Sequence, residues 1–154
     1  MSDPITDFLA LKRIAIAGVS RSRDQPANLN YRRLRELGYE VVAVNPRADV
    51  VEGDRCFPDL ASIPGGVEGV LAFTAPDDTN QIARQCIDLG IKHLWMHRSF
   101  GAGSVSQKAV DLCRQRGIRV IPGGCPMMVL SPVDLGHRCM RWVLRLTGGL
   151  PHAA

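Results

Sequence analysis

The segment Arg13-Ile-Ala-Ile-Ala-Gly-Val-Ser-Arg-Ser-Arg23 decides the fold of this chain. Its apolar run at residues 14–18 ends in a glycine, which predicts a strand that is buried on both faces. A loop of small hydroxyl and basic residues follows, and a helical pattern then runs over residues 27–38. A strand, a glycine turn and a helix in this order are typical of a unit that binds phosphate at the start of its helix.

The composition is that of an ordinary globular protein. Of its 154 residues, 45% are hydrophobic and 22% charged, which suits one domain with a core of its own. No apolar run approaches the roughly 20 residues of a membrane span, and the first residues do not predict a signal peptide. The five cysteines are scattered without a CxxC pair, which favours free thiols in a reducing, cytoplasmic setting.

The charge of the chain narrows its partners. The net charge of +4 suits an anionic ligand. Aromatic residues make up only 5% of the chain and are not interleaved with a basic run, so we expect no nucleic-acid surface. We expect a small-molecule ligand, without nucleic acid or membrane as a partner.

Strand and helix signals alternate along the chain with short links. Further apolar runs predict strands at residues 40–45, 67–73, 92–96 and 119–121. Helical stripes follow the first strand (Ala27, Tyr31, Leu34, Leu37) and Pro76 (Ile82, Ala83, Cys86, Ile87), and a third helix begins at a capping box of Ser104 and Gln107. Residues 47–64 are the least regular, with one short helix at 59–63. The alternation predicts an α/β fold: a doubly wound parallel sheet, Rossmann-like, of about five strands with helices on both faces.

The end of the chain predicts one more helix, at about residues 131–147. Its apolar face comprises Leu135, Cys139, Trp142, Val143 and Leu146. This face either packs back on the domain or forms the contact of a homodimer. No linker or repeat divides the chain, so we expect a single domain over residues 1–154.

The first loop carries the chemistry that a phosphate ligand needs. Gly18 allows the backbone to approach a ligand closely, and Ser20 and Ser22 offer hydroxyl groups beside the start of a helix. Arg21 and Arg23 add positive charge. The alternative is an ordinary turn in which the serines cap the helix.

The second strand narrows the choice of nucleotide. An NAD site requires a glycine where Ser20 stands and an acid at the end of the second strand, but this strand ends in Asn45-Pro46-Arg47. An arginine there suits a phosphorylated ribose, which both NADP and coenzyme A (CoA) carry. A Walker-type loop is absent from the sequence. Both nucleotides remain candidates on these residues alone.

An ordered set of short motifs resembles the CoA-binding proteins, a family related to the CoA-binding Rossmann domain of the succinyl-CoA synthetase α subunit. The set comprises Gly18-Val-Ser20, Val44-Asn-Pro-Arg47, Gly53 with Cys56-Phe-Pro-Asp-Leu60, and Trp95. It spans residues 12–129. The resemblance implies a small, stand-alone protein that binds CoA or acyl-CoA.

The resemblance also implies where each part of CoA lies. The pyrophosphate would contact the loop formed by Gly18, Val19, Ser20, Ser22 and Arg23. The adenosine end would contact Val44, Asn45, Pro46 and Arg47. The opposite wall would consist of Thr74, Ala75 and Pro76, and His97 would lie near the thiol-bearing arm.

The chain departs from the common pattern of the family near His97 and at Gly124-Cys125. Both His97 and Cys125 follow strands, so a thiolate–imidazole pair or a mixed disulfide with CoA is conceivable, but a buried cysteine and a structural histidine are the commoner outcome. No set of residues has the spacing of metal ligands. We therefore expect no catalytic residues and no metal, and the competing hypothesis is a small NADP-dependent oxidoreductase or NADP sensor.

Overall fold

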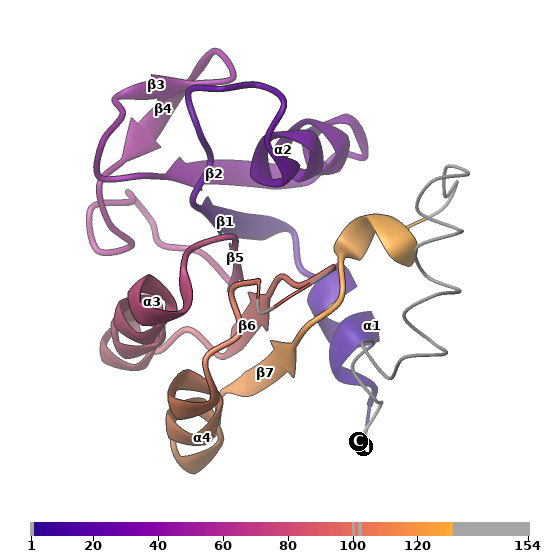
Figure 1. Cartoon of the computed structure of the whole chain (residues 1–154), viewed down its shortest axis with the longest axis vertical. Coiled ribbons are helices and arrows are strands. Elements are labelled where there is room, and N and C mark those ends of the chain that lie inside the picture. Colours follow the sequence, from indigo (N-terminus) through magenta and orange to yellow (C-terminus); the bar gives the residue numbers. More distant parts are fainter. Residues whose placement is uncertain (1, 100, 102, 131–154) are drawn as a thin grey trace.

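The computed structural model describes residues 2–99, 101 and 103–130 of the chain (Figure 1). Its centre is a seven-stranded sheet in the order β3-β4-β2-β1-β5-β6-β7. The strands are β1 (Arg13–Ala17), β2 (Glu40–Val44), β3 (Val50–Val51), β4 (Asp54–Phe57), β5 (Gly69–Ala72), β6 (His93–Met96) and β7 (Arg119–Pro122). All neighbouring strands are parallel except β3 and β4. The predicted doubly wound parallel sheet is confirmed, with two strands more than the five expected.

The two additional strands form in the stretch that the sequence left irregular. Glu52 and Gly53 both have positive φ angles, of 51° and 80°, and connect β3 to β4 in a two-residue hairpin. The prediction of a short helix at residues 59–63 is wrong. The Asp59 carboxylate accepts hydrogen bonds from the amide and the hydroxyl of Ser62, which closes a turn there instead.

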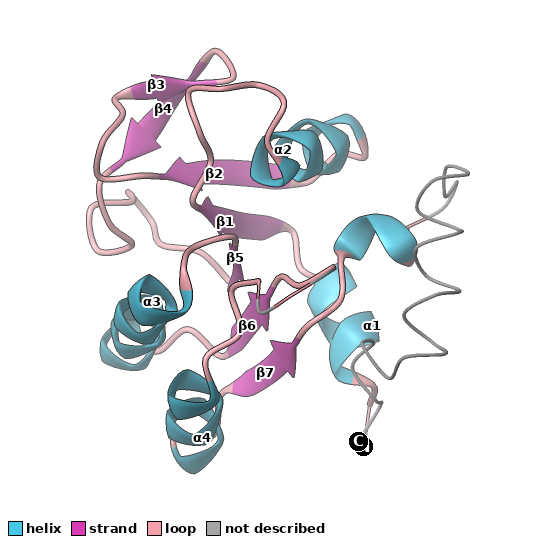
Figure 2. Cartoon of the chain, in the orientation of Figure 1, coloured by secondary structure: helices cyan, strands magenta, loops and turns pink. Residues whose placement is uncertain are grey.

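Helices cover both faces of the sheet (Figure 2). They are α1 (Pro4–Leu9), α2 (Pro26–Glu36), α3 (Pro76–Leu89) and α4 (Gln107–Gln115), followed by a short 3₁₀ helix, η1 (Pro126–Met128). The sequence did not predict α1 or η1. The predicted helix at about residues 131–147 lies outside the described residues.

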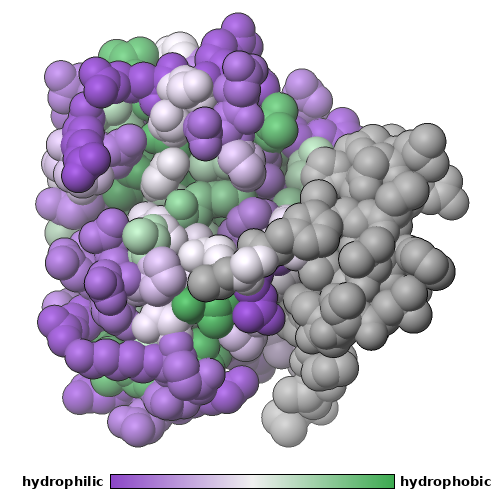
Figure 3. All heavy atoms as spheres, viewed as in Figure 1, coloured by the Kyte–Doolittle hydropathy of each residue, from purple (hydrophilic) through white to green (hydrophobic). Residues whose placement is uncertain are grey.

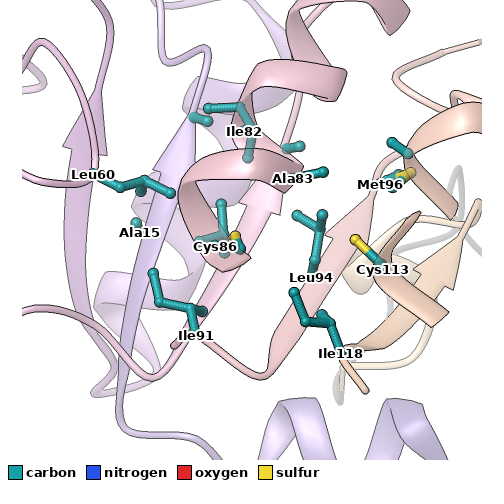
Figure 4. Close-up of a cluster of buried hydrophobic side chains, with 14 of the residues drawn as sticks. Ala15, Leu60, Ile82, Ala83, Cys86, Ile91, Leu94, Met96, Cys113 and Ile118 are labelled. Carbon is teal, nitrogen blue, oxygen red and sulfur yellow. The ribbon is translucent and has the colours of Figure 1, made fainter. Parts of the chain in front are cut away.

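Strand β1 shows how the two faces are filled. Ala15 and Ala17 point into a buried cluster that includes residues of α3 and α4, such as Cys86 and Cys113 (Figure 4). Ile14 and Ile16 belong to a second buried cluster on the other face, with Phe8 of α1, Tyr31 and Leu34 of α2, and Trp95 of β6. Residues that alternate along a strand point to opposite faces, so this pattern confirms a sheet buried on both sides.

Two details of the helices differ from prediction. Ser106 rather than Ser104 caps α4, because its Oγ accepts the Ala109 amide at 3.4 Å, while the Ser104 amide donates to the His97 carbonyl in the preceding loop. Leu37, predicted on the buried stripe of α2, is 39% exposed because the helix ends at Glu36.

The helices can also be compared with the length and apolarity that a membrane span requires. Within the part of the chain that the structure describes, no helix has both the length and the apolarity needed to cross a bilayer.

Candidate functional site

Two hollows open side by side where β1 and β5 end, the point at which the order of the strands reverses direction. The α2 hollow, of about 430 Å³, lies against the first residues of α2 and the ends of β5 and β6. The α3 hollow, of about 480 Å³, lies between the end of β2 and helix α3. Gly18 and Thr74 line both hollows, so the two adjoin at these residues and are together called the crevice.

Figure 3 shows one face of the molecule, on which paler and hydrophobic side chains gather toward the middle and hydrophilic side chains lie to the left, above and below. Ligand sites commonly combine a less polar floor with a few polar groups.

Gly18 permits the close approach of two strands at the floor of this crevice. Its φ is +93°, and a Cβ atom there would lie 3.0 Å from the carbonyl oxygen of Phe73. The Gly18 amide donates to the Val44 carbonyl at 2.9 Å. Only glycine combines a positive φ with the absence of a Cβ atom, and this position requires both.

A buried asparagine fixes the turn that follows Gly18. Asn28 of α2 accepts the Ser20 amide at 2.9 Å through Oδ1 and donates to the Ser20 carbonyl at 2.7 Å through Nδ2. The Ser20 hydroxyl oxygen accepts the Ser22 amide at 3.0 Å. The predicted phosphate loop is therefore held by its own hydrogen bonds, and both backbone polar atoms of Ser20 are already used.

A buried carboxylate stabilises Asn28 in turn. The side chain of Glu52 is only 1% exposed and accepts from Asn28 Nδ2 at 2.9 Å and from Arg32 at 2.8 Å. Burial alone would raise the pKa of Glu52, but the bond from Asn28 and the charges of Arg32 and Arg23 hold it below its usual value. The carboxylate thus stays charged, and its charge is balanced by the two arginines.

The loop after β2 is tied to the loop after β1. Asn45 Nδ2 donates to the Val19 carbonyl at 2.8 Å, and its Oδ1 accepts the Arg47 amide at 2.9 Å. This Asx turn presents Pro46 and Arg47, both exposed, at the edge of the α3 hollow. Val19 is fully buried, so it contributes to this loop through its bond with Asn45 and is not exposed to a ligand.

The opposite wall is the start of α3. The hydroxyl groups of Thr74 and Thr79 lie 2.8 Å apart, and Thr79 also donates to the Ala75 carbonyl at 3.1 Å. Because Thr79 is fully buried and its hydroxyl group bonds that of Thr74, it fixes the position of Thr74 at the junction of the two hollows.

His97 and Cys125 differ in their surroundings. His97 lines the α2 hollow, stacks on Phe73 and has its Nε2 3.2 Å from the Ser99 hydroxyl. Cys125 is only 3% exposed, and its Sγ lies 3.8 Å from Nδ2 of the buried Asn30. Each side chain therefore has neighbours of its own that fix its place.

The crevice also contains two carboxylates that the sequence did not lead us to expect there. Asp59 and Asp78 both line the α3 hollow, which Arg47 also lines. The carboxylate of Asp59 is occupied by Ser62, and Asp78 lies in the first turn of α3, where the helix dipole favours an acid.

The structure brings together most of the predicted residues. Gly18, Ser20, Thr74, Ala75 and His97 line the α2 hollow; Gly18, Val44, Asn45, Pro46, Arg47 and Thr74 line the α3 hollow. Four predicted residues line neither: Val19, Ser22, Arg23 and Pro76. Arg23 instead faces a third, outer hollow with Arg21, Arg35 and the β3–β4 turn, and its Nε lies 3.6 Å from Glu52.

Sequence reasoning missed Asn28, Phe73 and Glu52. For Asn28 a signal existed, because it lies next to Ala27 and three residues before Tyr31, on the face of α2 that the stripe predicts as buried. Phe73 was read only as the end of a strand. No group of residues suited to a metal ion occurs in the described ranges.

These features define a class of protein: an open, doubly wound α/β domain of the Rossmann kind, with its crevice at the reversal of strand order. Within that class the chain belongs to the CoA-binding domain family, whose model matches residues 12–131.

The chain is also similar to two proteins over most of their lengths. A structure of a hypothetical protein from Pyrococcus horikoshii is 30% identical with a TM-score of 0.74, covering 80% of this chain and 84% of that one. An uncharacterised Bacillus subtilis protein, YneT, is 25% identical over 114 residues, covering 74% of this chain and 82% of its own length.

A larger relative carries an activity in its name. Acetate–CoA ligase (ADP-forming) II of Archaeoglobus fulgidus is 21% identical over 124 residues. The match covers 75% of this chain but only 18% of the ligase, so the ligase contains a great deal that this chain does not match.

Proposed function

We propose that this chain is a small, stand-alone CoA-binding protein that holds CoA or an acyl-CoA in the crevice formed by the α2 and α3 hollows. The observation that carries the proposal is that the family match coincides with a switch-point crevice lined by most of the predicted ligand residues. We assign the chain no reaction of its own.

The pyrophosphate is assigned to the junction of the two hollows, between the starts of α2 and α3. Among the four described α-helices, α1 and α4 have side-chain N-caps, whereas α2 and α3 have none and begin at this crevice. Uncapped amides at helix starts favour phosphate groups. Since the Ser20 oxygen already accepts the Ser22 amide, its hydrogen is left to donate to a phosphate oxygen.

The nucleoside end is assigned to the α3 hollow. Arg47 lies at its edge, on an Asx turn that fixes the backbone beside Pro46. Its guanidinium suits the 3′-phosphate of the CoA ribose, because arginine binds phosphate through two parallel hydrogen bonds.

The arm that carries the thiol is assigned to the α2 hollow. The stacked rings of Phe73 and His97 form one wall of this hollow, and Gly103 and Ser104 lie beside them. An apolar and aromatic wall suits the pantetheine chain better than it suits a charged group.

The test is a titration of the purified chain with CoA, acetyl-CoA, dephospho-CoA, NADP and NAD, followed by calorimetry and by melting temperature. A ligand that binds only the folded form raises the free energy of unfolding by about 2.7 kcal/mol at a hundredfold excess over Kd. We expect CoA to stabilise the protein more than dephospho-CoA and NAD do. Stabilisation by NADP and not by CoA would contradict the proposal and favour the alternative hypothesis of an NADP site.

A further inference from the structure

The turn between β3 and β4 has an unusual residue in a demanding position. Glu52 is the only non-glycine residue with a positive φ in the described part of the chain. With Gly53 it forms the pair of positive-φ residues that a type I′ hairpin requires, where asparagine, aspartate or glycine is normally favoured first. Turn chemistry therefore does not explain the glutamate, and a backbone outlier of this kind points to a role for the side chain.

The side chain of Glu52 begins a short series of hydrogen bonds that ends at the phosphate loop. Its Oε1 accepts from Asn28 Nδ2 at 2.9 Å, and Asn28 bonds both backbone polar atoms of Ser20, at 2.9 and 2.7 Å. The Asn28 side chain is fully buried and that of Glu52 is 1% exposed. Bonds shielded from water in this way hold their geometry, because breaking them leaves buried polar atoms unsatisfied.

We propose that Glu52 and Asn28 are positioning residues, which hold the Ser20 turn in the conformation that receives the phosphate groups of CoA. This inference rests on the proposed function. A loop fixed before binding loses less conformational entropy when the ligand arrives, so the cost of ordering is removed from the affinity. The hairpin β3–β4, which lies outside the crevice, thereby contributes to binding without touching the ligand.

The positioning role of Glu52 depends on its acceptor oxygen and does not depend on its charge. An acid near a phosphate site would repel the ligand, but Arg32 at 2.8 Å and Arg23 at 3.6 Å balance it. Glutamine at this position keeps an acceptor oxygen for Asn28 at the same reach, but it loses the charge and the second oxygen, which faces Arg23. Asparagine suits the type I′ turn better but is one methylene shorter, so it fails to reach Asn28.

Four single variants separate positioning from stability. Asn28→Ala removes the bonds to Ser20, and Asn30→Ala is its matched control: it removes a buried asparagine of the same helix that bonds Pro26 and Cys125 instead. Glu52→Asn removes the bridge while favouring the turn, and Glu52→Gln retains it. Each variant is titrated with CoA by calorimetry, and exchange of the Ser20 amide proton is followed by NMR without ligand.

We expect Asn28→Ala and Glu52→Asn to raise the CoA dissociation constant about tenfold and to speed exchange of the Ser20 amide. Glu52→Gln and Asn30→Ala stay within about twofold of the parent chain. Equal losses in Asn28→Ala and Asn30→Ala, or unchanged CoA affinity in Glu52→Asn, would overturn the positioning role. If the parent chain binds no CoA, both the proposed function and the positioning role fail. Faster exchange of the Ser20 amide in the variants would then show that the bonds from Glu52 to Asn28 and Ser20 serve only the structure of the loop.

Discussion

Phe73 and His97 stack on each other, with ring centroids 4.3 Å apart and planes inclined by 29°. The stack follows from the register of the sheet, because Ala72 of β5 is paired with Met96 of β6 and each ring belongs to the next residue. Two parallel strands that end level with each other thus deliver two aromatic rings to one wall of the α2 hollow.

This stack predicts which part of CoA depends on His97. We expect His97→Ala to weaken CoA binding about two- to tenfold, because the arm loses apolar contact with one ring of the wall assigned to it. The same change should leave binding of 3′-phosphoadenosine 5′-diphosphate, which lacks the pantetheine arm, unaltered. Calorimetry with both ligands measures this, and equal losses for the two would move the arm away from His97.

Gly18 and Gly38 offer a matched pair of substitutions. Both have a φ of +93°, but a Cβ at Gly18 meets the Phe73 backbone at 3.0 Å, whereas Gly38 has open space. We expect Gly38→Ala to cost about 1–2 kcal/mol through backbone strain alone. Gly18→Ala should cost clearly more and also weaken CoA binding. Denaturant unfolding measures both costs, and equal values would show that the sheet yields at Phe73.

Arg47 is predicted to recognise the phosphorylated ribose. Arg47→Ala should weaken CoA binding by about ten- to a hundredfold and dephospho-CoA binding by far less, because a charge-assisted hydrogen bond contributes about 1.5–3 kcal/mol. Arg114→Ala, on the exposed side of α4, serves as the control. Equal losses for the two ligands in Arg47→Ala would remove this role from Arg47.

Glu52 gives the fold a dependence on pH. Its pKa in the folded state lies below the usual 4.5, so its contribution to stability is present above that pH and is lost as the pH falls through the folded value. Glu52→Gln has no such group. The difference in the free energy of unfolding between parent and variant should therefore be largest near neutral pH and shrink below about pH 4.5. A constant difference would contradict the charged state assigned to Glu52.

The start of α4 distinguishes Ser106 from Ser104. Ser106→Ala should lower stability by about 1 kcal/mol through loss of the helix cap, without changing CoA affinity. Ser104→Ala removes a side chain that does not cap this helix and should cost less. Thermal unfolding compares the two, and a larger loss at Ser104 would restore the capping box that the sequence suggested.

Five of the seven strands were predictable because each is a continuous apolar run buried on both faces. Strands β3 and β4 were not, since they are short, lie at the edge, and turn at Glu52-Gly53 rather than at a familiar hairpin pair. Val50 and Val51 are both apolar although Val50 is 62% exposed, so the sequence shows no alternation of apolar and polar residues there.

The site was predictable where backbone geometry demands a residue type and unpredictable where a side chain acts at long range in the sequence. Gly18 was predicted because a glycine turn after a strand has a local signature, whereas Asn45 was expected only from the resemblance to the family. The bond from Asn28 to Glu52 joins residues 24 positions apart, and only the hairpin brings them together. Phe73 was missed because its ring position depends on strand register.

The shared lining of the two hollows has a practical consequence for ligand discovery. Because Gly18 and Thr74 border both hollows, two small fragments, one bound in each hollow, would lie close to each other. Joining the two fragments past Gly18 converts the second binding event into an intramolecular one, with the gain in effective concentration that such a linkage brings. Screening for fragments that bind simultaneously is therefore a route to a synthetic competitor that need not imitate a nucleotide.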